Sequence, residues 1–114
     1  MSTGTGPLAG LRVLDIGTRI AAPFAAGLLA DFGAEVVKIE NPRGGDFMRS
    51  IGPFSEDYSL WWAVEGRGRK SITLDLRQPE GQEIFRRLIP HFDVVVENFR
   101  PGTLEKWNIG PEVL

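Results

Sequence analysis

The sequence predicts an α/β domain built on a parallel β-sheet, and three observations carry this prediction. A branched apolar strand, a helix and a second such strand follow one another within residues 11–40, which is the order of a βαβ unit. Strand and helix patterns alternate again over residues 71–107. The segments EVVKIENPRGG and DVVVENFRPGT share a strand, then Glu-Asn, then Arg, Pro and Gly in altered order. This weak pseudo-repeat favours two related units within one sheet.

The first βαβ unit has clear boundaries in the sequence. Residues 11–16 (LRVLDI) have the pattern of a short apolar strand, and a loop of mostly small residues follows. Pro23 suits the first position of a helix, and Gly33 suits its C-terminal cap. The helix is apolar on nearly every face, so we expect it to be buried on several sides. Residues 35–40 (EVVKIE) form the second strand.

Residues 41–70 lack a long periodic pattern and are rich in glycine. We expect a long loop with one short helix around Tyr58–Val64. Long loops inside a compact domain are uncommon and are usually functional. A second interpretation is an extension that packs on a partner segment, and the sequence leaves both open.

Regular structure returns in the second half of the chain. Residues 71–76 (SITLDL) predict a third strand, and Pro79 opens a helix that Pro90 ends or distorts. Residues 93–97 (DVVVE) predict a fourth strand, whose three valines suit a buried position. A short helix, TLEKW, follows Pro101 and Gly102.

The composition fits a single folded domain. The chain has 114 residues, of which 42% are hydrophobic, and a net charge of −2. This balance gives no basis for binding nucleic acid or a membrane surface, and the longest apolar run is too short to span a bilayer. Cysteine is absent and the N-terminus lacks a signal-peptide pattern, so we expect a cytoplasmic protein. We divide the chain into a tail over residues 1–10 and a domain over residues 11–114.

A ligand is expected at the carboxyl ends of the predicted strands, as in other open parallel sheets. Arginines gather there, and no Ser, Thr, Asp or Asn directly precedes Pro23 to cap the first helix. Free amides and arginines attract an anion such as phosphate. The alternative is that Thr18 or water caps the helix and the arginines are only solvated. The arginines concerned are Arg19, Arg43, Arg77 and Arg100.

The usual nucleotide motifs and the usual catalytic groups are missing. The loop GTRIAAP does not match G-x-G-x-x-G, and no P-loop motif occurs, which disfavours a nicotinamide reductase and a P-loop NTPase. His91 is the only histidine and suits a helix end or the surface, so no zinc site is predicted. Asp15 and Asp75 suit turns. Phe99 suits either the core or the face of a flat ring. Packing, or cover for a surface absent from this chain, is the expected role of Trp61, Trp62 and Trp107.

Three motifs together resemble one family. LRVLDIGTRIAAPFAAGLLADFGAEVVKIENPRGGD resembles the opening of the class III CoA-transferases, which include formyl-CoA transferase and carnitine CoA-transferase. GRKSITLDLRQPEGQEIF and DVVVENFRPGTLEKW resemble the next two motifs of that family. The resemblance runs from about Leu8 to Leu114. It implies a Rossmann-like parallel sheet that forms the N-terminal part of a larger, interlocked homodimeric fold. It also implies a CoA thioester and a small carboxylic acid as substrates, with no metal.

The resemblance also implies the residues that contact coenzyme A. In this picture ENFRPG forms one wall of the CoA site, with Pro101 and Gly102 shaping the turn and Arg100 adding positive charge. Asn41 stands where relatives often carry a basic residue, and Arg43 is the expected substitute. The contacts implied are Arg19, Ile20, Ala21, Asn41, Leu74, Arg77, Asn98, Phe99 and Lys106.

The implied activity is transfer of CoA from an acyl-CoA thioester to a carboxylic acid through an aspartyl intermediate. Members of the family are several-fold longer, and their catalytic aspartate corresponds to a position beyond residue 114. We therefore expect no catalytic residue in this chain and no turnover by the chain alone. An acyl-CoA racemase of the same superfamily and a non-catalytic CoA-binding remnant are the alternatives.

Overall fold

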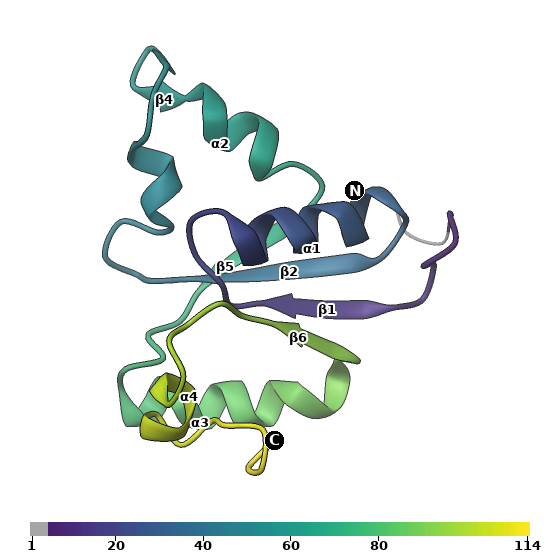
Figure 1. Ribbon diagram of the computed structural model, residues 1–114, viewed down its shortest axis with the longest axis vertical. Helices are drawn as coiled ribbons and strands as arrows, with labels where there is room; N and C mark the ends of the chain where they lie inside the picture. Colours follow the sequence, from purple (N-terminus) through teal and green to yellow (C-terminus); the bar gives the residue numbers. More distant parts are fainter. Residues whose placement is uncertain (1–4) are drawn as a thin grey trace.

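A four-stranded parallel sheet forms the centre of the molecule (Figure 1). The computed structural model describes residues 5–114. The sheet order is β5-β2-β1-β6, so the chain adds strands first on one side of β1 and finally on the other. The strands are β1 Arg12–Asp15, β2 Glu35–Glu40, β5 Lys70–Thr73 and β6 Val94–Val96. The predicted α/β class and the predicted parallel sheet are confirmed.

Helices cover both faces of this sheet. Helix α1 (Ala21–Asp31) lies on one face, whereas α3 (Pro79–Leu88), the 3-10 helix η2 (Ile89–His91) and α4 (Thr103–Lys106) lie on the other (Figure 1). Helix α1 begins two residues before the predicted start at Pro23. It ends as predicted, because Gly33 adopts a φ of +107° and donates its N–H to the carbonyl of Ala30.

The core consists of two clusters separated by the sheet. Alternate residues of β1 point to opposite faces, so Val13 packs toward α1 and Leu14 packs toward α3. On the α3 side, Phe85 is fully buried against the strands. Leu8 packs against the α1-side cluster and donates its N–H to the carbonyl of Phe32. The packed unit therefore includes part of the predicted tail 1–10, of which residues 1–4 lie outside the described chain.

The segment 41–70 has more regular structure than the predicted long loop with one short helix. It contains the 3-10 helix η1 (Phe47–Ser50), a hairpin of β3 (Phe54–Ser55) and β4 (Tyr58–Ser59), and helix α2 (Leu60–Glu65). The predicted helix at 58–64 thus begins two residues later, where the Ser59 hydroxyl caps it by accepting from the N–H of Trp62. Glu56 and Asp57 turn the hairpin with positive φ angles.

Three other expectations need correction. The third strand stops at Thr73 and not at residue 76, because the chain turns at Asp75 into α3. The fourth strand is an edge strand, and Val94 is 36% exposed, so it is not the buried strand that its valines suggested. Helix α1 is buried on one side only within residues 5–114.

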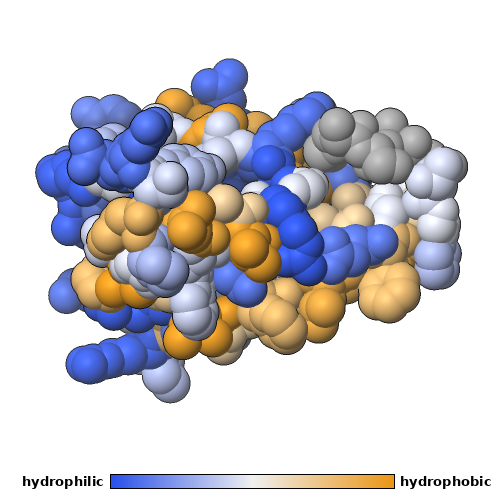
Figure 2. Space-filling model, turned by 90° about the horizontal axis from the view of Figure 1, so that it is seen from above, coloured by the Kyte–Doolittle hydropathy of each residue, from blue (hydrophilic) through white to orange (hydrophobic). Residues whose placement is uncertain are grey.

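The uncovered side of α1 carries a stripe of large apolar residues spaced four apart, which is one face of a helix. Helix α2 also exposes large apolar residues. Figure 2 shows hydrophobic side chains gathered along one side of the molecule. The α1 stripe consists of Ile20, Phe24, Leu28 and Phe32. No helix within residues 5–114 is long and apolar enough to cross a membrane.

Candidate ligand-binding site

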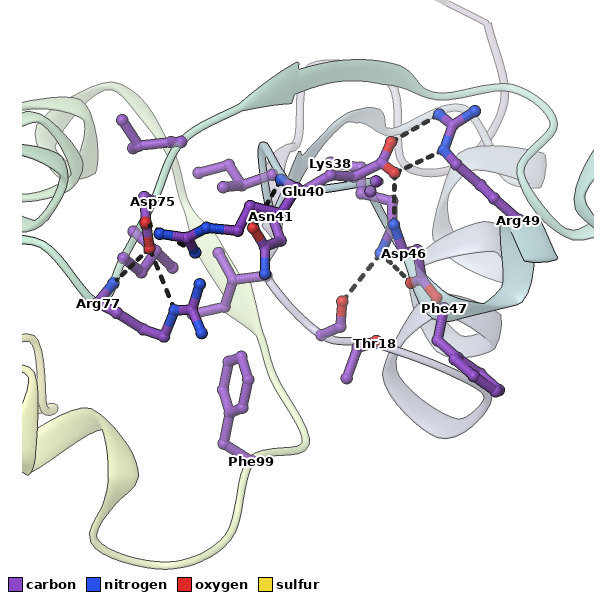
Figure 3. A pocket seen from close by; sticks show the side chains of 18 of the residues that line it. Thr18, Lys38, Glu40, Asn41, Asp46, Phe47, Arg49, Asp75, Arg77 and Phe99 are labelled. Carbon is purple, nitrogen blue, oxygen red and sulfur yellow. Dashed lines mark hydrogen bonds and ion pairs between the residues drawn. The ribbon is translucent and has the colours of Figure 1, made fainter.

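A cavity of about 600 Å³ lies at the carboxyl ends of the parallel strands. The loops after β1, β2, β5 and β6 each contribute to its wall, at the edge where the sequence predicted a ligand. Figure 3 shows Asp75 and Arg77 on one side, Asp46, Phe47 and Arg49 on the other, and Phe99 between the two sides. The cavity therefore joins four segments that are distant in the sequence.

A buried group of four charges supports one wall. The ammonium Nζ of Lys38 lies 3.5 Å from Asp15 Oδ2 and 3.1 Å from Asp46 Oδ2, and its side chain is 1% exposed. It also donates to the carbonyl of Gly17 at 2.9 Å, while Arg69 Nη1 pairs with Asp15 Oδ2 at 3.1 Å. The Lys38–Asp46 contact is an ion pair without hydrogen-bond alignment. Two cations thus balance two carboxylates, which limits the cost of burying them.

A third buried carboxylate, that of Glu40, supports the same wall. Burial raises the pKa of Glu40, but hydrogen bonds from Arg49, from the Ser71 hydroxyl and from the N–H of Asp46 outweigh burial and hold that pKa at about 2. The same pairing raises the pKa of Arg49. Arg49 Nε and Nη2 each lie 2.7 Å from a Glu40 oxygen, so the pair is bidentate. Its guanidinium also lies 4.3 Å from the ring centroid of Trp62, which connects this wall to α2.

The start of α1 has no side-chain cap, as the sequence predicted. Thr18 does not provide one. Arg19 adopts a left-handed φ of +67°, and its N–H donates to Asp46 Oδ1 at 3.2 Å. The Arg19 guanidinium lies 4.1 Å from the ring centroid of Phe47. Ile20 and Ala21, the other predicted contacts here, are exposed at the first turn.

Two arginines share one carboxylate at the rim of the cavity. Arg43 Nη1 and Arg77 Nε each lie 3.4 Å from an oxygen of Asp75, and the arginine side chains are 62% and 48% exposed. The Asn41 side chain does not join this cluster of charges. Its Oδ1 accepts the N–H of Arg43 and shapes the turn. Two positive charges against one negative charge leave this rim positive, with many guanidinium donors unused.

An aromatic pair forms the remaining wall. The rings of Phe99 and Trp107 meet edge to face with their centroids 5.2 Å apart, and both line the cavity. Asn98 is turned to Thr18 instead. Its Nδ2 donates to the Thr18 carbonyl and its Oδ1 accepts the Thr18 N–H, so it ties the loop after β6 to the loop after β1.

The structure brings some of the predicted contacts to the cavity and leaves others beside it. The ones that line the cavity are Asn41, Leu74, Arg77 and Phe99. Those outside the lining are Arg19, Ile20, Ala21, Asn98 and Lys106. The sequence analysis missed Lys38 and Asp46. The available signal was a lysine at the centre of an otherwise apolar strand, EVVKIE.

The family model for CoA-transferase family III matches residues 8–114. The chain belongs to this family. Membership confirms the predicted resemblance, so the function of the cavity is considered in relation to family III.

Among family III relatives, the beta subunit of succinyl-CoA–L-malate CoA-transferase from Chloroflexus aurantiacus is 54% identical over 114 residues, which is 99% of this chain. Succinyl-CoA:mesaconate CoA-transferase from Haloarcula hispanica is 46% identical over 96% of this chain. The chain spans 28% of the length of each of these relatives.

Solved structures agree with this assignment. A hypothetical protein from Mycobacterium tuberculosis matches with a TM-score of 0.86 and 42% identity. A CAIB/BAIF family protein from Brucella suis matches with a TM-score of 0.86 and 38% identity. Each match covers 96% of this chain and 30% of the other. The fold described here is therefore that of one part of the longer family III chains.

Proposed function

We propose that the cavity binds the CoA portion of an acyl-CoA thioester. The observation that carries this proposal is the placement of a positive two-arginine rim and an aromatic wall around one cavity at the carboxyl edge of the sheet. Guanidinium groups suit phosphates, and an aromatic face suits the adenine ring. Leu74 and Arg77 supply apolar and charged contacts from the same loop.

We further propose that the whole protein transfers CoA from an acyl-CoA to a small carboxylic acid through an aspartyl intermediate. The relatives named above are succinyl-CoA transferases, which favours transfer over racemisation. In this proposal the present chain binds CoA and holds it, while the nucleophile lies outside residues 1–114. A homodimeric assembly and a cytoplasmic location belong to the same proposal.

Calorimetric titration of the chain with CoA tests the binding proposal. We expect saturable binding with one CoA per chain, weakened about tenfold in Arg77→Gln, because a charge-assisted contact to phosphate is lost. Arg87→Gln is the matched control, since Arg87 is exposed on α3 away from the cavity lining. No binding by the unaltered chain, or equal losses in the two variants, would overturn the proposal.

Incubation of the chain with succinyl-CoA and a dicarboxylic acid tests whether the chain binds CoA without catalysing the transfer. We expect CoA binding without formation of a new thioester. Turnover by the chain alone would show that a nucleophile lies within residues 1–114, and the proposed role as a binding part would then be wrong.

A further inference from the structure

Arg19 holds a backbone conformation that an arginine rarely adopts. Four residues other than glycine have a positive φ in the described chain, and two of them, Glu56 and Asp57, form the hairpin turn. Asn108 follows α4. Arg19 and Asn108 each follow a residue that lines the cavity, Thr18 and Trp107, and of these two only Arg19 carries a charge. Strained residues persist where surrounding contacts fix them, and they often occur at binding sites.

Two consecutive residues in the segment after β2, Asp46 and Phe47, hold Arg19 in place. Asp46 Oδ1 accepts the N–H of Arg19 at 3.2 Å and the N–H of Met48 at 2.9 Å, so one oxygen joins the loop after β1 to the start of η1. The ring of Phe47 lies under the guanidinium, 4.1 Å from it to the centroid. Backbone and side chain of Arg19 are therefore held by consecutive residues.

Asp46 is itself rigidly held. Its side chain is 1% exposed, its Oδ2 pairs with Lys38 Nζ at 3.1 Å, and its N–H donates to Glu40 Oε1 at 2.8 Å. Capping a four-residue 3-10 helix alone does not require a carboxylate paired with a buried lysine. The buried pair fixes the oxygen that receives Arg19.

The guanidinium that results is free to bind an anion. Among the ion pairs within residues 5–114, none involves Arg19. Stacking on Phe47 occupies one face of the guanidinium plane and leaves its N–H edge available. Phe47, on whose ring the guanidinium stacks, lines the cavity on the side opposite Arg77 (Figure 3).

We propose that Asp46 and Phe47 are positioning residues that hold Arg19 in its left-handed conformation, so that its guanidinium contacts a phosphate group of the bound CoA. This inference rests on the proposed function. It adds that the contact depends on the Asp46 carboxylate and the Phe47 ring, neither of which needs to touch the ligand. The contribution of Arg19 to CoA affinity would then depend on the Asp46 and Phe47 side chains.

A double-mutant cycle on CoA affinity tests the proposal with Asp46→Asn, Arg19→Gly and the double variant, titrated with CoA by calorimetry. We expect Asp46→Asn to weaken binding about tenfold, because the ion pair with Lys38 that fixes the oxygen receiving Arg19 is lost. In the Arg19→Gly background the same change should weaken binding less than about twofold, because no guanidinium remains to be positioned. A purely structural role would give the same loss in both backgrounds and would overturn the proposal.

Phe47→Leu is a second test of the proposal, and it leaves the buried charges intact. Phe47 is 46% exposed, so its loss should not unfold the chain. We expect about threefold weaker CoA binding with an unchanged melting temperature. Phe54→Leu is the control, because Phe54 is 53% exposed on the hairpin and outside the cavity lining. Affinity unchanged by Phe47→Leu contradicts the inference, whereas failure of the unaltered chain to bind CoA contradicts the proposed function instead.

Discussion

Arg49 and Glu40 form a bidentate ion pair in which both guanidinium–carboxylate distances are 2.7 Å. The Glu40 side chain is 2% exposed, and the pair joins the last residue of β2 to η1. This contact holds the segment that carries Asp46 and Phe47 against the sheet. The wall of the cavity on this side therefore depends on Glu40 as well as on the buried Lys38–Asp46 pair.

Stability should fall in acid as Glu40 becomes protonated. Its pKa is about 2 in the folded chain against an ordinary value of 4.5, so the pairing stabilises the fold above about pH 4.5 and is lost as the pH falls toward 2. The contribution is at most about 3 kcal/mol, and less where solvent screens the exposed part of Arg49. Urea unfolding across this pH range measures it.

Glu40→Gln should flatten this part of the pH dependence and lower stability at neutral pH. Glu56→Gln serves as the control, because Glu56 is exposed at the hairpin turn. An identical acid dependence in Glu40→Gln and the unaltered chain would show that this pair does not govern acid stability.

Phe99→Ala should weaken CoA binding with little loss of folding. Phe99 is half-buried and lines the cavity, where its ring meets Trp107. Losing one aromatic face should cost about 1–2 kcal/mol of binding free energy, close to tenfold in Kd. Calorimetry and thermal melting on the same samples separate the two effects. Phe54→Ala should leave Kd unchanged, and collapse of the Phe99→Ala fold would disprove the ligand-wall role.

Gly81→Ala should destabilise the chain although alanine is the better helix former. A Cβ at residue 81 would lie 2.0 Å from the carbonyl oxygen of Asp75, so α3 or the Asp75 turn has to move. We expect a loss of about 1–3 kcal/mol in unfolding free energy. The loop it displaces carries Arg77, so CoA affinity should fall as well. Arg87→Ala on the same helix should change stability by less than about 0.5 kcal/mol. A gain in stability from Gly81→Ala would contradict the close packing.

Gly44 and Gly45 should respond differently to alanine. Both have positive φ angles, so both variants share the cost of a left-handed alanine. A Cβ on Gly45 would also lie 2.5 Å from Glu40 Oε1, whereas one on Gly44 meets nothing within 4 Å. We expect Gly45→Ala to be about 1 kcal/mol less stable than Gly44→Ala by urea unfolding. Equal stabilities would mean that the Glu40–Arg49 pair can shift freely.

The elements of the first βαβ unit could be predicted because local signals and tertiary structure agree there. Periodicity marked both strands, and Gly33 marked the end of α1. The hairpin was missed because its turn uses Glu56 and Asp57 at positive φ in place of the glycine or asparagine that announces such turns. Edge exposure of Val94 depends on what flanks the sheet, which strand composition does not encode.

The edge of the sheet that holds the cavity could be predicted, but the buried charges beside the cavity could not. Strand ends and arginines pointed to the edge where the cavity lies. Lys38 was missed because its partners, Asp15 and Asp46, come from a neighbouring strand and a later loop. Asn98 was expected to face the ligand, yet both atoms of its amide bond Thr18. Such pairings arise from sheet register, which the sequence does not display.

The most direct test of the CoA site is amide chemical-shift mapping by NMR during titration with CoA. We predict shifts concentrated after the four parallel strands, at Thr18, Gly44, Leu74, Arg77 and Phe99, with no change at the hairpin residues 54–59. Shifts confined to the hairpin or to the exposed stripe of α1, or no shifts at saturating CoA, would contradict the site described here.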